Sequence, residues 1–314
     1  MTTALITGAS AGLGEGFARA LAAEGTTLIL TARRVDRLES LATELRAAHG
    51  VTVHVFAADL ADPDGSATLI AAIAAAALPV DVLINNAGFG ARGDFEDLDS
   101  ALQLGMIDLN CRALVALSHA VLPQMIARGS GGILNIASVA SFQPGPWMAV
   151  YYASKAFVLS FSEALHEEVK AKGVRVAALC PGPTRTEFAD IAGLGDTALF
   201  ERLASDPGAV VRDGLAALAA NRAVKVSGAL NFAMAEGIRF TPRSLNRSFA
   251  ILLAQAVGGG FGIVQFGIAL DTAVVDVRDG RINGEGQLGK LVVDRVEARH
   301  IVSRRKGGAV GERL

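Results

Sequence analysis

The segment T-G-A-S-A-G-L-G, from Thr7 to Gly14, joins a short apolar run, Ala4 to Thr7, to a stretch of helical period, Gly14 to Glu24. Glycines allow a tight turn and let the backbone approach a ligand closely. The N-terminus of the helix that follows offers unpaired N–H groups and a partial positive charge, which suit a pyrophosphate. Glycine turns also join strands to helices for packing reasons alone. The position of this turn near the N-terminus favours a nucleotide-binding loop.

Apolar runs typical of buried strands alternate with longer segments of helical period over the first 180 residues. This alternation predicts βαβ crossovers, and therefore an α/β fold: a Rossmann-like, doubly wound parallel sheet with helices on both faces, in a single domain. After Ala4–Thr7, the predicted strands are Thr27–Ala32, Val51–Ala57, Val80–Ile84, Ile133–Ala137 and Val174–Leu179. The predicted helices are Gly14–Glu24, Val35–Ala48, Asp64–Leu78, Ser100–Arg128 and Met148–Lys172.

The pattern is less regular beyond residue 190. A helix is predicted over Pro207–Asn221, a short strand over Ala223–Val226 and a further helix over Leu230–Ile238. The segment from 186 to 250 is therefore expected to supply the elements that cover a substrate, and its apolar side chains suit an apolar one.

The stretch from Ser248 to Leu270 runs 23 residues without a charged side chain, and Arg239, Arg243 and Arg247 precede it. That length can span a bilayer, and arginines on one side fit a cytoplasmic flank. Five glycines and two glutamines interrupt the stretch, so we expect a segment that lies on a surface or in the core. Membrane attachment stays open as an alternative. A hairpin over 271–284 and a basic tail from 290 to 314 are predicted to follow.

Composition excludes several classes of protein. A hydrophobic content of 51% excludes a disordered chain, and a net charge of −2 argues against a nucleic-acid partner, because phosphate contacts need a surplus of Lys and Arg. Cys111 and Cys180 are isolated and the five histidines form no ligand spacing, so neither a disulfide nor a metal site is predicted. The N-terminus lacks the regions of a signal peptide, which makes a cytoplasmic location the expectation.

The chain has only two tyrosines, and they are adjacent, at Tyr151 and Tyr152. Tyr151 and Lys155 are four residues apart, so they share one face of the predicted helix. A free phenol has a pKa near 10 and is a poor acid–base catalyst at neutral pH, but a nearby ammonium lowers that pKa. Because Tyr152 also reaches Lys155 on a helix, spacing alone does not decide between the two tyrosines.

Taken together, the motifs resemble the short-chain dehydrogenase/reductase family. The residues that carry the resemblance are Thr7–Gly14 (T-G-x-x-x-G-x-G), Asp59, Asn85–Gly88 (N-N-A-G), Asn110, Ser138, Tyr151–Lys155 (Y-x-x-x-K) and Pro181-Gly182. All occur in the family's order and at its spacings, including the 13 residues from Ser138 to Tyr151. The resemblance covers residues 1 to 190, thins out toward 250, and does not extend to 250–314.

The resemblance implies a role for each catalytic candidate. It selects Tyr151 over Tyr152 as the group that exchanges a proton with the substrate oxygen. Ser138 would hydrogen-bond that oxygen and stabilise the charge that develops there. Lys155 would hold the nicotinamide ribose and lower the pKa of Tyr151. Asn110 would keep a water in the proton relay behind Lys155.

The end of the second strand bears on the choice of cofactor. An acidic residue there would bind the ribose 2′-hydroxyl of NAD, whereas an arginine accommodates the 2′-phosphate of NADP. This chain has Arg33 and Arg34 and no acid before Asp36, and Ser10 could add a hydroxyl. We therefore expect NADP(H) rather than NAD(H).

The resemblance also implies which residues line the cofactor. The backbone of Asn86 to Gly88 would lie along the adenine-side ribose, Asp59 and Leu60 would contact the adenine, and the segment after Pro181 would line the nicotinamide and its amide or phosphates. The full candidate set is Gly8, Ser10, Gly12, Leu13, Gly14, Arg33, Arg34, Asp59, Leu60, Asn86, Ala87, Gly88, Asn110, Tyr151, Lys155, Pro181, Gly182, Thr184 and Thr186.

We expect an NAD(P)-binding domain over 1–250 and an atypical glycine-rich and basic extension over 251–314. The expected activity is hydride transfer between NADPH and a small to medium, apolar carbonyl or alcohol substrate. An NAD-dependent alcohol dehydrogenase of the same fold, a membrane-attached enzyme and a non-catalytic nucleotide-binding protein remain as alternatives. By resemblance, the chain would form a homodimer or homotetramer through the helices that carry Asn110 and Tyr151.

Overall fold

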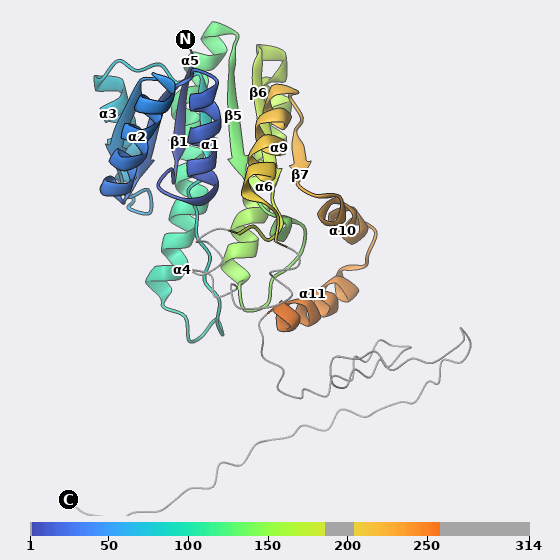
Figure 1. Cartoon of the computed structure of the whole chain (residues 1–314). Helices are drawn as coiled ribbons and strands as arrows, with labels where there is room; N and C mark the ends of the chain where they lie inside the picture. Colours follow the sequence, from blue (N-terminus) through green and yellow to red (C-terminus); the bar gives the residue numbers. More distant parts are fainter. Residues whose placement is uncertain (1, 186–203, 258–314) are drawn as a thin grey trace, which may run out of the picture. The chain divides into compact units, whose positions relative to one another are not determined.

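A computed structural model describes residues 2–185 and 204–257 (Figure 1). Within these residues, seven parallel strands form one sheet in the order β3-β2-β1-β4-β5-β6-β7. This is the doubly wound α/β fold that the sequence predicts. The strands are β1 (Thr3–Thr7), β2 (Thr27–Ala32), β3 (Val53–Ala57), β4 (Val82–Asn85), β5 (Gly131–Ile136), β6 (Val174–Cys180) and β7 (Val224–Val226).

Helices cover both faces of the sheet, because both faces of its strands are apolar. Ala4 and Ile6 of β1 pack with Phe17 on one side, whereas Leu5 belongs to a separate cluster with Leu69 on the other. This alternation is the period of a strand buried on both faces. The first side holds α1 (Gly12–Ala23), α2 (Val35–His49) and α9 (Pro207–Ala219), and the second holds α3 (Gly65–Ala75), α5 (Leu114–Arg128) and α6 (Ala149–Val169).

The predicted helix over Ser100–Arg128 is interrupted. The structure has α4 (Ser100–Ile107), a π-helical segment η1 (Asp108–Ala113) and then α5. An i→i+5 turn widens a helix locally and occurs often at functional sites, but it leaves the apolar period of the sequence intact. Sequence reasoning therefore predicted the helix and missed its interruption, which falls on Asn110.

Ser100–Arg128 is also a run long and apolar enough to cross a membrane by length and composition, and no other such run is found in the described part. It packs against α3 and α6 inside the domain. Core helices of ordinary domains pass the same test, so the observation is weak evidence for a membrane span.

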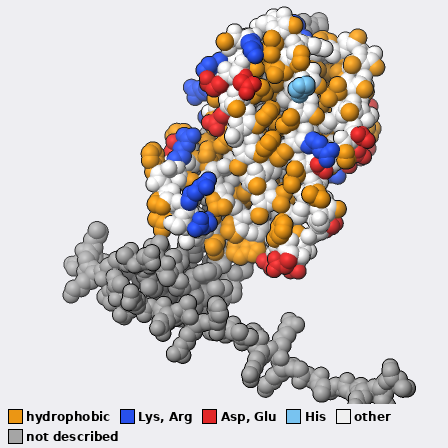
Figure 2. Space-filling model, turned by 180° about the vertical axis from the view of Figure 1, so that it is seen from behind, with side chains coloured by type: hydrophobic (Ala, Val, Ile, Leu, Met, Phe, Trp, Pro, Cys, Tyr) orange, Lys and Arg blue, Asp and Glu red, His pale blue; other side chains and the backbone are white. Residues whose placement is uncertain are grey.

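From behind, the molecule shows many hydrophobic side chains with few charged ones between them (Figure 2).

The predicted elements after residue 204 are confirmed as α9, β7 and α10 (Ala229–Arg239), and a last helix, α11, spans Arg243–Val257. The predicted domain boundary at 250 falls inside α11. The covering segment 186–203, with Thr186, and the predictions for 258–314, including the hairpin and the basic tail, lie outside the described residues. Two short 3-10 turns follow β5 and α6: η2 (Val139–Phe142) and η3 (Lys170–Lys172).

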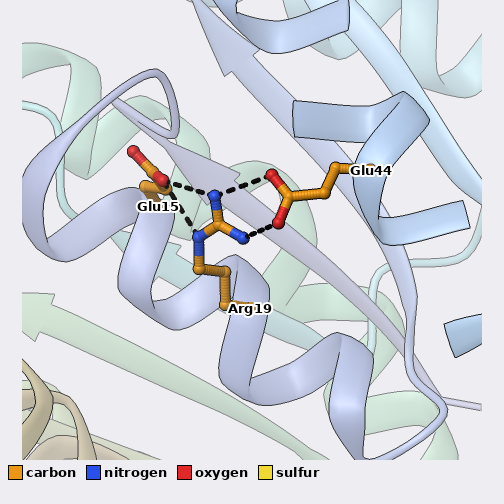
Figure 3. A network of polar contacts seen from close by, with 3 residues as sticks. All are labelled: Glu15, Arg19 and Glu44. Carbon is orange, nitrogen blue, oxygen red and sulfur yellow. Dashed lines mark hydrogen bonds and ion pairs between the residues drawn. The ribbon is translucent and has the colours of Figure 1, made fainter. Parts of the chain in front are cut away.

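A charged network joins α1 to α2 on the surface (Figure 3). Arg19 of α1 donates to Glu15 on its own helix, with an Nη2–Oε1 distance of 2.7 Å, and to both carboxylate oxygens of Glu44 on α2. Bidentate contact with Glu44 raises the pKa of Arg19 further above its ordinary value. The network ties together the helices that begin after β1 and after β2.

Candidate active site

The strand order reverses between β1 and β4, where the connections leave toward opposite sides of the sheet. In parallel α/β sheets, ligands bind at this switch point, outside the carboxyl ends of the strands. Thr7 and Asn86 hold the ends of β1 and β4 together. The Thr7 hydroxyl accepts the N–H groups of Asn86 (3.0 Å) and Ala87 (2.9 Å), and the Asn86 side-chain amide donates to the Thr7 carbonyl (2.9 Å).

The predicted glycine loop forms a turn made of bare backbone. Gly8 and Gly12 adopt positive φ angles of 65° and 58°, which favour glycine over residues with side chains. A Cβ on Gly14 would lie 2.2 Å from the Gly8 carbonyl oxygen. Ala11 precedes α1 without a side-chain cap, so no side chain competes for the first N–H groups of the helix. The loop fits a pyrophosphate at the helix N-terminus.

The structure brings together two of the residues predicted to bind a 2′-phosphate. Arg34 donates from Nε and Nη2 to the hydroxyl oxygen of Ser10, at 3.2 Å each. Arg33 and Arg34 are both exposed at the end of β2. A planar guanidinium beside a hydroxyl is a suitable donor set for a phosphate.

The adenine-side candidates lie at the ends of the neighbouring strands. Asp59 is exposed after β3, and its carboxylate accepts the N–H of Ala61 at 3.0 Å. The side chain of Leu60 is buried in the apolar cluster of α3 and α5. Gly88 follows β4, and a Cβ there would lie 2.9 Å from Asn110 Oδ1 and 3.4 Å from Lys155 Nζ. A side chain on Gly88 would therefore crowd the catalytic candidates.

The three catalytic candidates Ser138, Tyr151 and Lys155 meet at the carboxyl end of β5. Ser138 follows the strand and its hydroxyl is hydrogen-bonded to the phenol of Tyr151. Lys155, one turn along α6, lies with Nζ 5.9 Å from the centre of the Tyr151 ring and donates to the Ile136 carbonyl at 2.8 Å. Both Tyr151 and Lys155 are more than 90% buried, at 8% and 6% exposure.

Asn110 reaches this cluster from the π-helical segment. Its amide pairs with the backbone of Phe89, accepting the N–H at 3.1 Å and donating to the carbonyl at 3.0 Å. The same amide donates to Ser154 at 3.0 Å, and Ser154 donates to the Tyr151 carbonyl at 2.7 Å. The Asn110 side chain thus connects the loop after β4 to α6 by hydrogen bonds. The predicted role in holding a water stays a prediction.

The pKa of Tyr151 corrects one expectation. Burial raises the pKa of Tyr151 to about 12, against the opposing effect of the Ser138 hydrogen bond. Lys155 is buried as well, and burial lowers its own pKa to about 8. The net shift of the Tyr151 pKa is therefore opposite to the lowering expected from the sequence. The physical reason is desolvation, which disfavours the charged form of both groups.

An apolar cluster surrounds the phenol ring. Its buried members are Ala91, Met106, Ala140, Met148 and Tyr151, with Phe89, Val150 and Tyr152 at its edge. Tyr152 packs edge-on against Tyr151, with ring centres 6.0 Å apart. A carbon skeleton beside the reactive oxygen would therefore meet apolar walls.

Two loops beside this cluster are joined to each other. The indole N–H of Trp147 donates to Asp94 at 2.9 Å, and the N–H of Gly93 donates to the Trp147 carbonyl at 3.0 Å. Trp147 adopts a φ of 62°, which is rare and strained for a residue with a bulky side chain. Such strain persists only where surrounding contacts impose it, and it gathers at functional sites.

The segment after β6 lies beside the turn that carries Ser138. The Pro181 carbonyl accepts the N–H of Val139 at 2.9 Å, which places Pro181 beside the turn that carries Ser138. A Cβ on Gly182 would lie 2.3 Å from the amide of Asn231. Thr184 donates to the Gly182 carbonyl at 2.9 Å.

Sequence reasoning missed several supporting residues. Ser154 links Asn110 to the backbone of Tyr151, Ser141 donates to the Lys155 carbonyl at 2.7 Å, and Asp94 holds Trp147. The position of Ser154, three residues after Tyr151 and next to Lys155, could have suggested it. Asp94 and Ser141 had no such signal, because their roles depend on how separate loops meet.

Residues 2–193 match the family model for short chain dehydrogenases, which covers more than half of the chain. The chain belongs to the short-chain dehydrogenase/reductase family. It is therefore an oxidoreductase that acts on alcohol or carbonyl groups with a nicotinamide nucleotide, as the motifs predict.

Relatives and solved structures of the family agree with the fold. Sulfoacetaldehyde reductase 2 of Chromohalobacter salexigens is 42% identical over 204 residues, which are 64% of this chain and 80% of that protein. A short-chain dehydrogenase from Sphingobium yanoikuyae in complex with NADPH is 35% identical, with a TM-score of 0.68 over 76% of this chain and 93% of that one. The bulky-bulky ketone specific alcohol dehydrogenase of Comamonas testosteroni is 32% identical, with a TM-score of 0.65 over 76% and 92%.

Proposed function

We propose that this enzyme uses NADPH to reduce a small to medium, apolar carbonyl substrate, with Tyr151 as the proton donor. The observation that carries the proposal is the buried Tyr151 phenol, hydrogen-bonded to Ser138 and set beside Lys155 at the carboxyl edge of the sheet. Proximity to the glycine loop supports it, since a Cβ on Gly8 would lie 3.0 Å from Ala87 and a Cβ on Gly88 3.4 Å from Lys155 Nζ.

Each side chain has a distinct task in this proposal. Tyr151, with a pKa of about 12, stays protonated at neutral pH and can donate its proton to the substrate oxygen. Ser138 donates a hydrogen bond to the same oxygen as negative charge develops there. Lys155 binds the nicotinamide ribose and places an ammonium near the phenol. The cofactor, when bound, supplies the hydride. A phenol that is protonated at neutral pH suits reduction better than the reverse reaction.

The pairing of Arg34 with Ser10 supports NADPH over NADH. Fluorescence titration tests this with a double variant, R33Q/R34Q, and with R112Q as a control that removes a guanidinium from η1. We expect the double variant to bind NADPH about tenfold to a hundredfold more weakly, because each lost charge-assisted hydrogen bond costs about 1.5–3 kcal/mol. NADH binding should stay unchanged. Tighter binding of NADH by the unaltered enzyme would favour the NAD-dependent alternative.

The apolar cluster around Tyr151 supports an apolar substrate. The named relatives act on different carbonyl compounds, from sulfoacetaldehyde to bulky ketones, so only a direct assay can identify the substrate. A panel of aldehydes, ketones and hydroxysteroid-like alcohols, followed by NADPH consumption or NADP⁺ reduction, tests the activity. Binding of NADPH without turnover of any member would contradict the proposal.

We also propose a cytoplasmic homodimer or homotetramer that associates through α4 and α6. Leu104 and Ile107 of α4 and Phe157 of α6 are large apolar side chains that are exposed in the single chain. The two helices are in contact, so their exposed residues can form one surface. Light scattering after size exclusion should give a dimer or tetramer, and L104S/F157S should shift it toward the monomer. A monomeric wild-type enzyme would refute this assembly.

A further inference from the structure

A pocket of about 140 Å³ lies between α3, with the loop before it, and the segment formed by η1 and α5. Neither the catalytic candidates nor the glycine loop line it, and Leu60 is the one predicted cofactor residue among the described residues that do. An apolar cavity of about 150 Å³ takes a molecule of the size of benzene. The pocket is therefore large enough for a small organic molecule, and it is not the site described above.

The buried walls of the pocket are apolar. Leu60 and Ala113 are 5% and 3% exposed and belong to the apolar cluster on this side of the sheet. Ile70 of α3 packs against the same cluster and lines the pocket as well. A ligand with a carbon skeleton would remove apolar surface from water here, which favours its binding.

Ser66 adds one polar group to these walls. It is the second residue of α3, it is only 6% exposed, and it lines the pocket. Its hydroxyl makes no hydrogen bond with the residues that the structure describes. Buried polar groups nearly always have a hydrogen-bond partner. A buried hydroxyl that lacks one and borders a pocket points to a ligand that supplies it.

Two carboxylates also border the pocket, and each keeps one oxygen for a ligand. Oδ1 of Asp62 accepts the N–H of Asp64 at 2.8 Å, and Oδ1 of Asp108 accepts the guanidinium of Arg112. Within the described part of the chain, Oδ2 of Asp62 and Oδ2 of Asp108 have no partner. Two carboxylates against one guanidinium leave a net negative charge at the pocket, which favours a cation.

We propose that this pocket binds a small primary amine whose apolar body has about six carbon atoms. The ammonium group would donate to Asp62, Asp108 and Ser66, because its three N–H groups match these three acceptors in number. The apolar body would lie against Leu60 and Ile70. A ligand that ends in a carboxylate would be repelled by the two acids. This second site does not depend on the proposed substrate or cofactor.

Isothermal titration calorimetry of the full chain with benzylamine, an ammonium ion at neutral pH, tests the proposal. We expect saturable binding with a Kd of about 1 mM or tighter that weakens with added salt. Benzoate has the same ring and the opposite charge and should not bind. Saturation with NADPH should leave the affinity for benzylamine unchanged, because the glycine loop and the catalytic candidates lie outside the pocket.

Variants of the lining residues assign the binding to this pocket. D62N/D108N should weaken benzylamine binding about tenfold, since each exposed ion pair contributes about threefold in affinity. S66A should weaken it about threefold to tenfold, as the loss of one hydrogen bond does. A67F should weaken it most, because Ala67 lines the pocket and the larger side chain would fill it.

Matched controls change the same residue types elsewhere. E24Q/E168Q removes two exposed carboxylates, and A47F adds a phenyl ring to an exposed position of α2, so both should bind benzylamine as the unaltered protein does. Circular dichroism checks that every variant stays folded. The proposal fails if the unaltered protein does not bind benzylamine, binds benzoate equally, or loses the amine when NADPH is added. It also fails if any lining variant binds normally or a control binds as weakly as the lining variants.

Discussion

The two sides of the crevice are built on different principles. The cofactor side, after β1 and β2, consists of bare backbone and exposed groups: Gly8, Gly12 and Gly14 with Ser10 and Arg34. The catalytic side, after β4 and β5 and on α6, consists of buried side chains that hold one another by hydrogen bonds. The first side leaves its backbone open to a ligand, because its glycines have no side chains. On the second side burial excludes water, which raises the pKa of Tyr151 and lowers that of Lys155.

Tyr151→Phe should have the largest effect, and only on the catalytic side. The variant keeps the ring in the apolar cluster and removes the proton donor, so kcat should fall about a hundredfold to ten-thousandfold. NADPH affinity, measured by fluorescence titration, should change little. Tyr152→Phe is the matched control and should keep near-normal kcat. If Tyr152→Phe is the inactive variant, the proton donor has been assigned to the wrong tyrosine.

Gly14→Ala should damage the cofactor side instead. The new Cβ would lie 2.2 Å from the Gly8 carbonyl, a backbone atom that cannot move without opening the turn. We expect NADPH to bind at least about tenfold more weakly and the protein to lose about 1–3 kcal/mol of stability, as overpacking does. Gly237→Ala, where nothing lies within 4 Å, is the matched control in a helix and should be neutral or slightly stabilising. Equal effects of the two substitutions would mean that the turn tolerates a side chain.

The two sides also differ in how well the sequence predicted them. The glycine loop and Arg34 with Ser10 follow from strand order and spacing, whereas the meeting of Ser138 with Tyr151 was implied by the family resemblance, because spacing left Tyr152 open. The ends of parallel strands share one edge, and residues four apart share a helix face. The π-helical turn at Asn110 was not predictable, since it leaves the apolar period unchanged. The pKa of Tyr151 is raised where a lowering was expected, because burial, a property of the whole fold, outweighs the hydrogen bond with Ser138.

The buried ammonium of Lys155 should make stability depend on pH on the catalytic side alone. Burial lowers the pKa of Lys155 from 10.5 to about 8, so the folded state binds fewer protons than the unfolded state between these values. Stability from this group therefore increases as pH rises from 8 and is lost as pH falls through 8. Lys155→Met should remove about 2 kcal/mol of this increase between pH 8 and pH 10.

Denaturant unfolding of both proteins at several pH values measures the difference. Tyr151 does not complicate it, because a pKa raised from 10 to about 12 leaves its contribution fully present below pH 10 and lost only above. Parallel stability curves for the two proteins would show that Lys155 is hydrated in the folded state. The catalytic side would then be hydrated like the cofactor side, and the contrast between a buried side and an exposed side would fail.

The link between Trp147 and Asp94 should affect substrate binding more than chemistry. Trp147→Phe keeps an aromatic ring and removes the N–H that donates to Asp94. Loss of a hydrogen bond worth about 0.5–1.5 kcal/mol should raise KM about threefold to tenfold with kcat and NADPH affinity unchanged. Asp94→Asn keeps an acceptor oxygen and should behave as the unaltered enzyme, whereas Asp94→Ala should match Trp147→Phe. A fall in kcat without a change in KM would place the link in the catalytic step.

Arg19→Met should have the smallest effect, although it breaks the network that joins α1 and α2. The side chain is partly exposed, and such ion pairs contribute about 0–1 kcal/mol, so the melting temperature should fall by a few degrees at most. NADPH affinity should not change, because the backbone of the glycine loop is fixed by Thr7, Asn86 and the packing of Gly14. Thermal unfolding and cofactor titration of one variant test both statements. A clear loss of NADPH affinity would mean that surface charges position the cofactor side from outside, and that its geometry is not set by the backbone alone.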